Sequence, residues 1–254
     1  MITIVILGAG NVAQHLYTAF LNQSSVAIIQ CYNRKGIRIH KDQKAATITN
    51  DLNKLKKADL YILAISDDAI KKVSNTLPFQ NRLVVHTSGS VPIKAIDDKN
   101  YRGVFYPLQT FSATKEVDYS KIPFCIEADR QKDVIVLKNL ASILSQKVYD
   151  ISSDQRNVLH VAAVFVNNFT NYMFSVGNEI CNKNKVPFEI LHPLIQETAK
   201  KIIEIEPDIA QTGPAIRNDV LTIDRHLEIL KDDSQKQLYK MLTKAIQSKY
   251  GKEL

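Results

Sequence analysis

The fold of this chain is decided by residues 2–13, which read ITIVILGAGNVA. The largely apolar run of residues 2–7 before Gly8 predicts a buried strand, and the residues after Gly10 predict a helix that begins at once. Gly8, Gly10 and Ala13 match the pattern G-x-G-x-x-A, in which the first glycine allows a tight turn and the second lets a pyrophosphate approach the backbone. The start of the helix, with Asn11 and Val12, offers N–H groups to that pyrophosphate. Glycines also end strands in folds that bind nothing, but this order of strand, motif and helix favours a dinucleotide-binding turn.

A second strand is predicted over residues 26–32, and Asn33, Arg34 and Lys35 follow it directly. Enzymes that bind NAD usually place an acidic residue here to hold the ribose hydroxyls, and an acidic residue would repel a 2′-phosphate. The guanidinium of Arg34 can instead grip a phosphate. The sequence therefore predicts NADP, with NAD less favoured, and a solvated basic loop is the alternative.

Strands and helices alternate through the first 151 residues, which predicts a doubly wound, mostly parallel Rossmann-type α/β sheet covered on both faces. Further strands are expected at 47–49, 59–65, 82–86, 103–106, 124–127 and 147–150. The pattern then changes to helices, expected at 154–183, 188–204, 214–231 and 233–248. We expect a dinucleotide-binding domain over 1–151 and an all-α domain over 152–254.

Polar residues follow the predicted strands at the ends where a doubly wound sheet binds its ligands. The candidate cofactor contacts at these ends are Ile65, Ser66, Asp67, Thr87 and Ser88. Some of these side chains could instead cap the helices that follow. A serine nucleophile in His86-Thr87-Ser88 is disfavoured, because the G-x-S-x-G pattern of a nucleophile turn is absent.

The helix predicted from residue 154 carries His160, Asn167 and Asn171, which share one face at spacings of seven and four residues. Its other residues are largely apolar, so we expect it to be buried nearly all round. Buried polar groups either bond to one another or face a substrate cavity. We take His160, as proton donor, and Asn167 as the candidate catalytic residues. The candidate substrate contacts are Gln109, Asn168, Asn171 and Arg217.

The composition excludes several other classes of protein. The net charge of +7 lies entirely in residues 1–150, which would favour a phosphate-bearing ligand, although a basic but unspecialised surface is equally compatible. The lysines are dispersed and no aromatic-basic motif appears, so we expect no nucleic-acid partner. Three scattered cysteines predict no metal site and suit a reducing cytoplasm. No apolar run reaches the roughly 20 residues of a membrane span, so a soluble cytoplasmic protein is expected.

Five segments together resemble an uncharacterised bacterial family of Rossmann-like proteins. They are GAGNVA at 8–13, NR at 33–34, HTSGS at 86–90, YPLQTFS at 106–112 and TGPAIRND at 212–219. That family is generally described as NADP or deazaflavin-linked oxidoreductases and is similar to pyrroline-5-carboxylate reductase, prephenate dehydrogenase and the 6-phosphogluconate dehydrogenase superfamily. The resemblance implies dimerisation through the helical domain and an active site between the domains.

The resemblance also has two departures. Tyr106-Pro107-Leu108 resembles the His-Pro-Met segment of prephenate dehydrogenases, with Tyr in place of His. Hydroxyacid dehydrogenases of the superfamily carry Lys followed four residues later by Asn, where this chain has His160 and Val164. The leading hypothesis is hydride transfer between NADP and a small polar carbonyl, imine or hydroxyacid. The alternative is a non-catalytic sensor that binds NADP.

Overall fold

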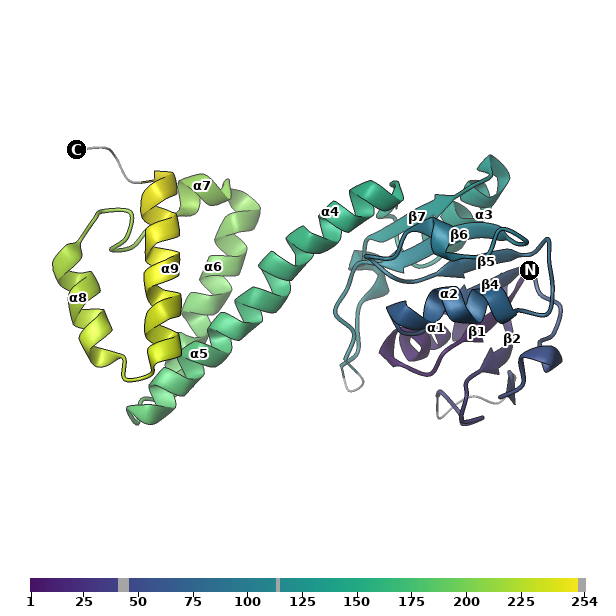
Figure 1. Cartoon of the computed structure of the whole chain (residues 1–254), viewed down its shortest axis with the longest axis horizontal. Helices are drawn as coiled ribbons and strands as arrows, with labels where there is room; N and C mark the ends of the chain where they lie inside the picture. Colours follow the sequence, from purple (N-terminus) through teal and green to yellow (C-terminus); the bar gives the residue numbers. More distant parts are fainter. Residues whose placement is uncertain (41–45, 113–114, 251–254) are drawn as a thin grey trace. The chain divides into compact units, whose positions relative to one another are not determined.

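The computed structural model describes residues 1–40, 46–112 and 115–250. These residues form two compact units, Met1–Ala163 and Val164–Leu254 (Figure 1). The units meet within a helical stretch, twelve residues beyond the end of the first predicted domain. The first helix of the C-terminal sequence is therefore part of the unit that contains the sheet.

The first unit is built on one eight-stranded sheet with the order β3-β2-β1-β4-β5-β6-β7-β8. The strands are β1 (Ile2–Leu7), β2 (Val26–Tyr32), β3 (Thr47–Thr49), β4 (Leu60–Leu63), β5 (Leu83–His86), β6 (Tyr101–Pro107), β7 (Phe124–Ala128) and β8 (Val148–Asp150). All neighbouring strands pair in parallel except β6 and β7. The predicted Rossmann-type α/β class is confirmed, and the order reverses between β1 and β4, where such sheets bind ligands.

Helices cover both faces of this sheet (Figure 1). They are α1 (Asn11–Leu21), α2 (Asp67–Thr76) and α3 (Gln131–Ser142), and α4 (Ser153–Ala163) follows β8. Ile4 and Ile6 pack in one buried cluster with residues of α1 and α3, whereas Val5 and Leu7 pack in a second cluster with Ile70 of α2. Alternate residues of a strand point to opposite faces, so the continuous apolar run of β1 is explained by burial on both sides.

The second unit is helical. Its helices are the π segment Val164–Phe169, α5 (Thr170–Lys183), α6 (His192–Glu204), α7 (Pro207–Ala210), α8 (Val220–Ile229) and α9 (Asp233–Tyr250). The prediction that a helix starts at Pro214 is wrong, because residues 214–218 form turns and Asn218 has a positive φ of 52°. The Asp219 side chain then accepts the Thr222 N–H at 3.1 Å and caps α8.

The long helical stretch from Ser153 is much more exposed than its apolar sequence predicts. Arg156 is the buried residue of α4, and none is buried in the π segment or α5. Phe165 is 63% exposed and Val166 72% exposed. The expectation of burial nearly all round is therefore wrong within one chain. No helix among the described residues has the length and apolar character needed to span a membrane.

Candidate functional site

Gly8 makes the turn after β1. Its φ of +137° lies in a region that L side chains rarely adopt. A Cβ built on Gly8 would lie 1.9 Å from the carbonyl oxygen of Ala64, in the chain that leaves β4. The Gly8 N–H also donates to the Tyr32 carbonyl at 2.8 Å. Glycine is thus required here for both the backbone conformation and the close approach of β1 to β4.

Gly10 precedes α1 and has a different role. Its φ of −77° and ψ of −179° are open to any residue, yet a Cβ there would meet no atom of the described chain within 4 Å. The first helical hydrogen bond runs from the Gln14 N–H to the Gly10 carbonyl, so the N–H groups before it point out of the helix. The first turn also contains no acidic residue. This open, electropositive space fits the diphosphate of a dinucleotide.

Asn33 follows β2 and shapes a turn whose tip carries the two predicted cations. Its side-chain amide donates to the Ile37 carbonyl at 2.7 Å and accepts the Ile37 N–H at 3.1 Å. The Gly36 N–H donates to the Asn33 carbonyl at 3.0 Å, which leaves Arg34 and Lys35 exposed at the centre of the turn. The amide of Asn33 is therefore engaged in the turn, while the two cations face solvent beside the glycine turn.

The polar residues predicted after β4 and β5 bond to one another. The Ser90 hydroxyl donates to Asp67 at 2.6 Å. The Ser88 hydroxyl oxygen accepts the N–H groups of Ser90 at 3.2 Å and Val91 at 3.1 Å. The loop of predicted cofactor contacts therefore also contains local hydrogen bonds of the kind expected under the alternative prediction. Thr87 and Ser88 are buried, whereas Asp67 and its neighbour Ser66 are exposed where α2 begins. Ile65 lies beside the glycine turn, 3.3 Å from a Cβ built on Gly8.

A tyrosine that sequence reasoning did not select lies against His160. The Tyr106 hydroxyl at the end of β6 is 3.4 Å from His160 Nδ1, a long hydrogen bond, and the two rings meet edge to face. A Cβ on Gly89 would lie 2.6 Å from His160 Nδ1 and 2.9 Å from the Tyr106 hydroxyl. Gly89 thus leaves the space in which the two side chains meet. Burial raises the pKa of Tyr106, with Cys125 and Asp67 adding to the shift and Arg156 opposing it.

His86, the last residue of β5, is fully buried. Its Nδ1 accepts the Ser88 N–H at 3.2 Å, which places the proton on Nε2. That Nε2 has no hydrogen-bond partner among the described residues. The nearby Pro92 carbonyl nevertheless raises the pKa of His86. Burial, assisted by the positive charge of Arg156, lowers the pKa of His86 to about 4, against the opposing effects of Asp67 and Pro92. His86 is therefore neutral near pH 7.

This burial predicts a loss of stability in acid. The unfolded chain takes up a proton on His86 near its ordinary pKa of 6.5, whereas the folded chain resists protonation down to about 4. The stability contributed by neutral His86 is complete above pH 6.5 and falls by about 1.4 kcal/mol per pH unit towards pH 4. His86→Gln should flatten this part of the pH dependence of the free energy of unfolding. Urea titrations of both proteins from pH 7 to 4 measure the difference, and parallel curves would contradict it.

The segment after β6 lies against the first turns of α1. The Asn11 side chain donates to the Phe111 carbonyl at 2.9 Å, and a ring nitrogen of His15 lies 2.9 Å from the Ser112 carbonyl. Gln109 is exposed, and its side-chain oxygen accepts the Thr110 N–H at 2.8 Å. This segment therefore lines one side of the glycine turn, but the Gln109 amide oxygen is engaged locally.

The remaining predicted residues belong to the second unit. Asn167 and Asn168 lie in the π segment and Asn171 lies in the first turn of α5, and all three are exposed. A π turn holds more residues than an α turn, so the shared face inferred from α-helical spacing does not extend from His160 across it. Arg217 is exposed in the turn before α8, where its charge helps to lower the pKa of Asp219.

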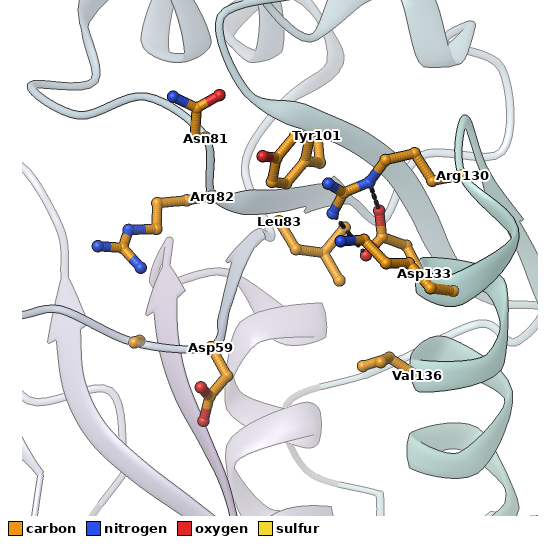
Figure 2. A pocket seen from close by; sticks show the side chains of 10 residues that line it. Asp59, Asn81, Arg82, Leu83, Tyr101, Arg130, Asp133 and Val136 are labelled. Atoms are coloured by element: carbon orange, nitrogen blue, oxygen red, sulfur yellow. Dashed lines mark hydrogen bonds and ion pairs between the residues drawn. The ribbon is translucent and has the colours of Figure 1, made fainter.

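A cavity of about 310 Å³ lies at the other edge of the sheet (Figure 2). It is lined by residues that precede β4 and β5, such as Asp59 and Arg82, and by Tyr101, Arg130 and Asp133. These are the amino ends of the parallel strands, whereas doubly wound sheets bind ligands at the carboxyl ends. The cavity is thus separate from the glycine turn. The described residues contain no group of three His, Cys, Asp or Glu that could hold a metal ion.

Comparison with known families matches both parts of the chain. A family described as NADP oxidoreductase coenzyme F420-dependent matches residues 3–89, and a family described as a domain of unknown function, DUF2520, matches residues 122–246. No curated protein matches the chain.

Solved structures match over nearly the whole chain. A protein from Bacteroides fragilis, provisionally described as an NADP oxidoreductase, is 40% identical, with 97% of this chain and 98% of that chain covered and a TM-score of 0.84. A Thermotoga maritima protein is 20% identical, with 96% and 97% covered and a TM-score of 0.73. An imine reductase from Myxococcus stipitatus, solved with NADP+, is 14% identical, with 98% and 99% covered and a TM-score of 0.65. The last two likenesses concern the fold.

Proposed function

The chain belongs to the family of the Bacteroides fragilis protein, with an NADP oxidoreductase domain before a DUF2520 domain, and on this premise we propose that it transfers hydride between NADP and a small polar substrate. The substrate would be a carbonyl, an imine or a hydroxyacid. One observation carries the proposal: the glycine turn after β1 and the Tyr106–His160 pair lie at the same edge of one mostly parallel sheet, at the carboxyl ends of the parallel strands β1 and β6.

The residues at this edge fit NADP. The open space in front of Gly10 and the first turn of α1 would receive the diphosphate. Arg34 and Lys35 at the tip of the turn after β2 would receive the 2′-phosphate, while Asn33 holds that turn in shape. The NADP expected from the sequence is confirmed at the level of the family.

The Tyr106–His160 pair would supply the proton that the reaction needs. Bound NADPH supplies a hydride to the carbon of a C=O or C=N bond, and the oxygen or nitrogen then takes a proton. The Tyr106 hydroxyl can donate that proton. His160, whose Nδ1 is 3.4 Å away, can return a proton to the Tyr106 hydroxyl or hold the tyrosine in place. Hydrogen bonds of this kind are often long in the unliganded enzyme and shorten when substrate binds.

Removal of the two cations should separate NADPH from NADH binding. Arg34→Gln combined with Lys35→Gln is expected to raise the Kd of NADPH about 10- to 100-fold, because a hydrogen bond to a charged group contributes about 1.5–3 kcal/mol. The Kd of NADH should stay within about twofold, because NADH lacks the 2′-phosphate. The chain has no Trp, so the binding titration should follow the fluorescence of the reduced cofactor itself.

The exposed lysine pair of α2 provides a matched control. Lys71→Gln with Lys72→Gln removes the same charge from the same unit and should leave both Kd values unchanged. Equal weakening of NADPH and NADH by the Arg34 and Lys35 changes would contradict the 2′-phosphate assignment. Wild-type protein that binds neither cofactor would overturn the proposed function.

We also propose that the second unit carries a homodimer interface. Phe165, Phe169 and Tyr172 recur at spacings of four and three residues, and each is at least half exposed. The rings of Phe165 and Phe169 meet edge to face with centroids 5.0 Å apart. Exposed aromatic side chains grouped in this way are typical of protein interfaces, and a twofold dimer covers the same patch on both subunits.

Phe165→Asp is expected to dissociate this dimer, with an increase of about 30-fold or more in the dimer dissociation constant, as for a central aromatic anchor. Sedimentation velocity over a range of concentrations measures the change. Lys240→Glu on α9, an exposed charge change in the same unit, is the control and should have no effect. A wild-type chain that remains monomeric at high concentration would refute the interface.

A further inference from the structure

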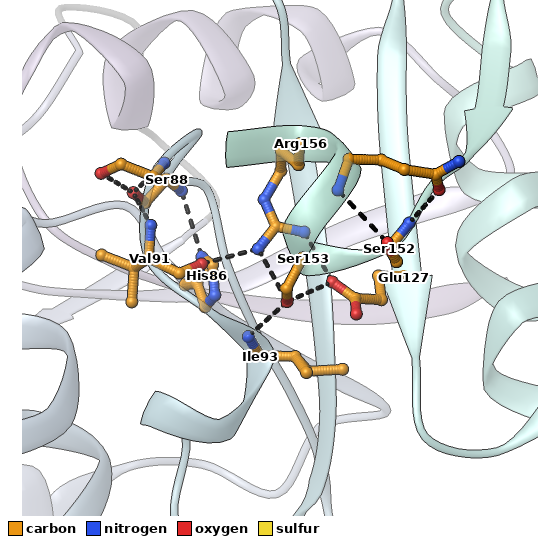
Figure 3. A network of polar contacts seen from close by, with 10 residues as sticks. His86, Ser88, Val91, Ile93, Glu127, Ser152, Ser153 and Arg156 are labelled. Carbon is orange, nitrogen blue, oxygen red and sulfur yellow. Dashed lines mark hydrogen bonds and ion pairs between the residues drawn. The ribbon is translucent and has the colours of Figure 1, made fainter. Parts of the chain in front are cut away.

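A buried arginine joins α4 to β7 and to the loop after β5 (Figure 3). Arg156 in α4 is 1% exposed. Its Nη1 donates to Glu127 Oε2 in β7 at 2.6 Å, and its Nη2 donates to the Val91 carbonyl, in the loop after β5, at 2.6 Å. One guanidinium thus ties the start of α4 to the sheet and to the loop that carries Ser88 and Gly89.

Ser153, the first residue of α4, completes the network. Its hydroxyl donates to Glu127 Oε2 at 2.8 Å and accepts the Ile93 N–H at 2.9 Å (Figure 3). It also accepts a hydrogen bond from Arg156 Nη2 at 3.2 Å. The position and rotation of the first turn of α4 are therefore fixed on two sides by side chains that cannot shift independently.

Arg156 and His160 are four residues apart in α4, so they lie on the same face of the helix one turn apart. The contact of His160 with Tyr106 depends on where that face points. We propose that Arg156 is a positioning residue, whose bonds to Glu127 and Val91 orient α4 so that His160 meets Tyr106. This inference rests on the proposed function, in which that pair supplies the proton.

Stability alone explains this network poorly. A buried ion pair can often be replaced by apolar residues without loss of stability, so its presence is weak evidence of a stabilising role. Two buried donors beside it, Arg156 Nε and His86 Nε2, have no partner among the described residues. The network does fix the orientation of α4, because the guanidinium group of Arg156 donates hydrogen bonds to two elements at once.

Arg156→Lys separates the effect of the charge from that of the hydrogen-bond geometry. It keeps the positive charge and loses the planar guanidinium group that bonds to Glu127 and Val91 together. Ser153→Ala is the milder variant, because it removes one hydroxyl and leaves the ion pair. Arg102→Lys is the matched control, since Arg102 pairs with Asp129 in the same unit, apart from the network around α4. Each protein is tested as the full chain for its melting temperature, its Kd for NADPH, and the NMR cross-peaks between the rings of Tyr106 and His160.

Turnover is measured with NADPH and three probes: 1-pyrroline as an imine, an aldehyde and a 2-oxoacid. We expect Arg156→Lys to lose the Tyr106–His160 cross-peaks and at least about tenfold in kcat, with KM and the Kd of NADPH within about twofold. Ser153→Ala should show the same pattern more weakly, and Arg102→Lys should match the wild type.

Each outcome bears on one proposal. Cross-peaks that persist in Arg156→Lys, or in Ser153→Ala should the lysine variant not fold, would overturn the positioning role. A wild type that binds no NADPH would instead overturn the proposed function, while the cross-peaks still decide how His160 is placed. A fall in kcat that is accompanied by a lower melting temperature and by weaker NADPH binding would indicate that Arg156 has a structural role only, and would overturn the positioning role.

Discussion

His160→Gln is expected to lower kcat about 10²- to 10⁴-fold, the usual contribution of a positioned proton donor, with the Kd of NADPH within about twofold. The ring of His160 lies 3.4 Å from the Tyr106 hydroxyl, and glutamine cannot carry a proton to it. Tyr106→Phe removes the hydroxyl itself and should have an effect of similar size. The double variant should be little worse than either single one, because the two side chains act as a unit.

The measurement is NADPH oxidation at 340 nm with the substrate that wild-type protein reduces best, over pH 5 to 9. His192→Gln is the control, because His192 is an exposed histidine at the start of α6 in the second unit. Full activity of Tyr106→Phe, or effects of the two single variants that multiply in the double variant, would show that the pair does not act in proton transfer.

The sequence alone predicts the first unit well because its signals are local. The central strands β1, β4 and β5 are short runs of mostly apolar residues, and β1, β2 and β3 begin and end at the predicted residues. The glycine turn is equally local, because strand, motif and helix follow one another directly. The predicted start of a helix at Pro214 fails because a left-handed residue, Asn218, interrupts the chain four residues later, and no helical pattern reveals a positive φ.

The parts of the site that the sequence does not predict depend on contacts between distant segments. In the sequence, Arg156 resembles any charged residue on the surface of a helix. It is tolerated as a buried charge because it pairs with Glu127 from β7. Tyr106 becomes a candidate site residue only through its contact with His160, which lies 54 residues later in the chain. One signal was present: Gly89 sits among polar residues at a strand end, where a missing side chain often marks a close approach.

The two glycines of the turn should give opposite results when each is replaced by alanine. Gly8→Ala places a methyl group 1.9 Å from the Ala64 carbonyl oxygen at a φ of +137°. Backbone strain of this kind costs about 1–3 kcal/mol, and the clash with a backbone atom adds to it. We expect a total loss of about 3 kcal/mol or more, which lowers the melting temperature by about 6–12 °C in a protein of this size.

Gly10→Ala should leave the fold intact and impair cofactor binding. Its backbone conformation suits alanine and its Cβ meets no described atom, so the melting temperature should be unchanged or slightly higher. The methyl group would occupy the space that the diphosphate needs, so the Kd of NADPH should rise about tenfold or more. Differential scanning calorimetry and NADPH titration on both variants separate the two effects. If Gly10→Ala bound NADPH as tightly as the wild type, the diphosphate could not lie against this turn, and the cofactor would have to bind elsewhere on the sheet edge.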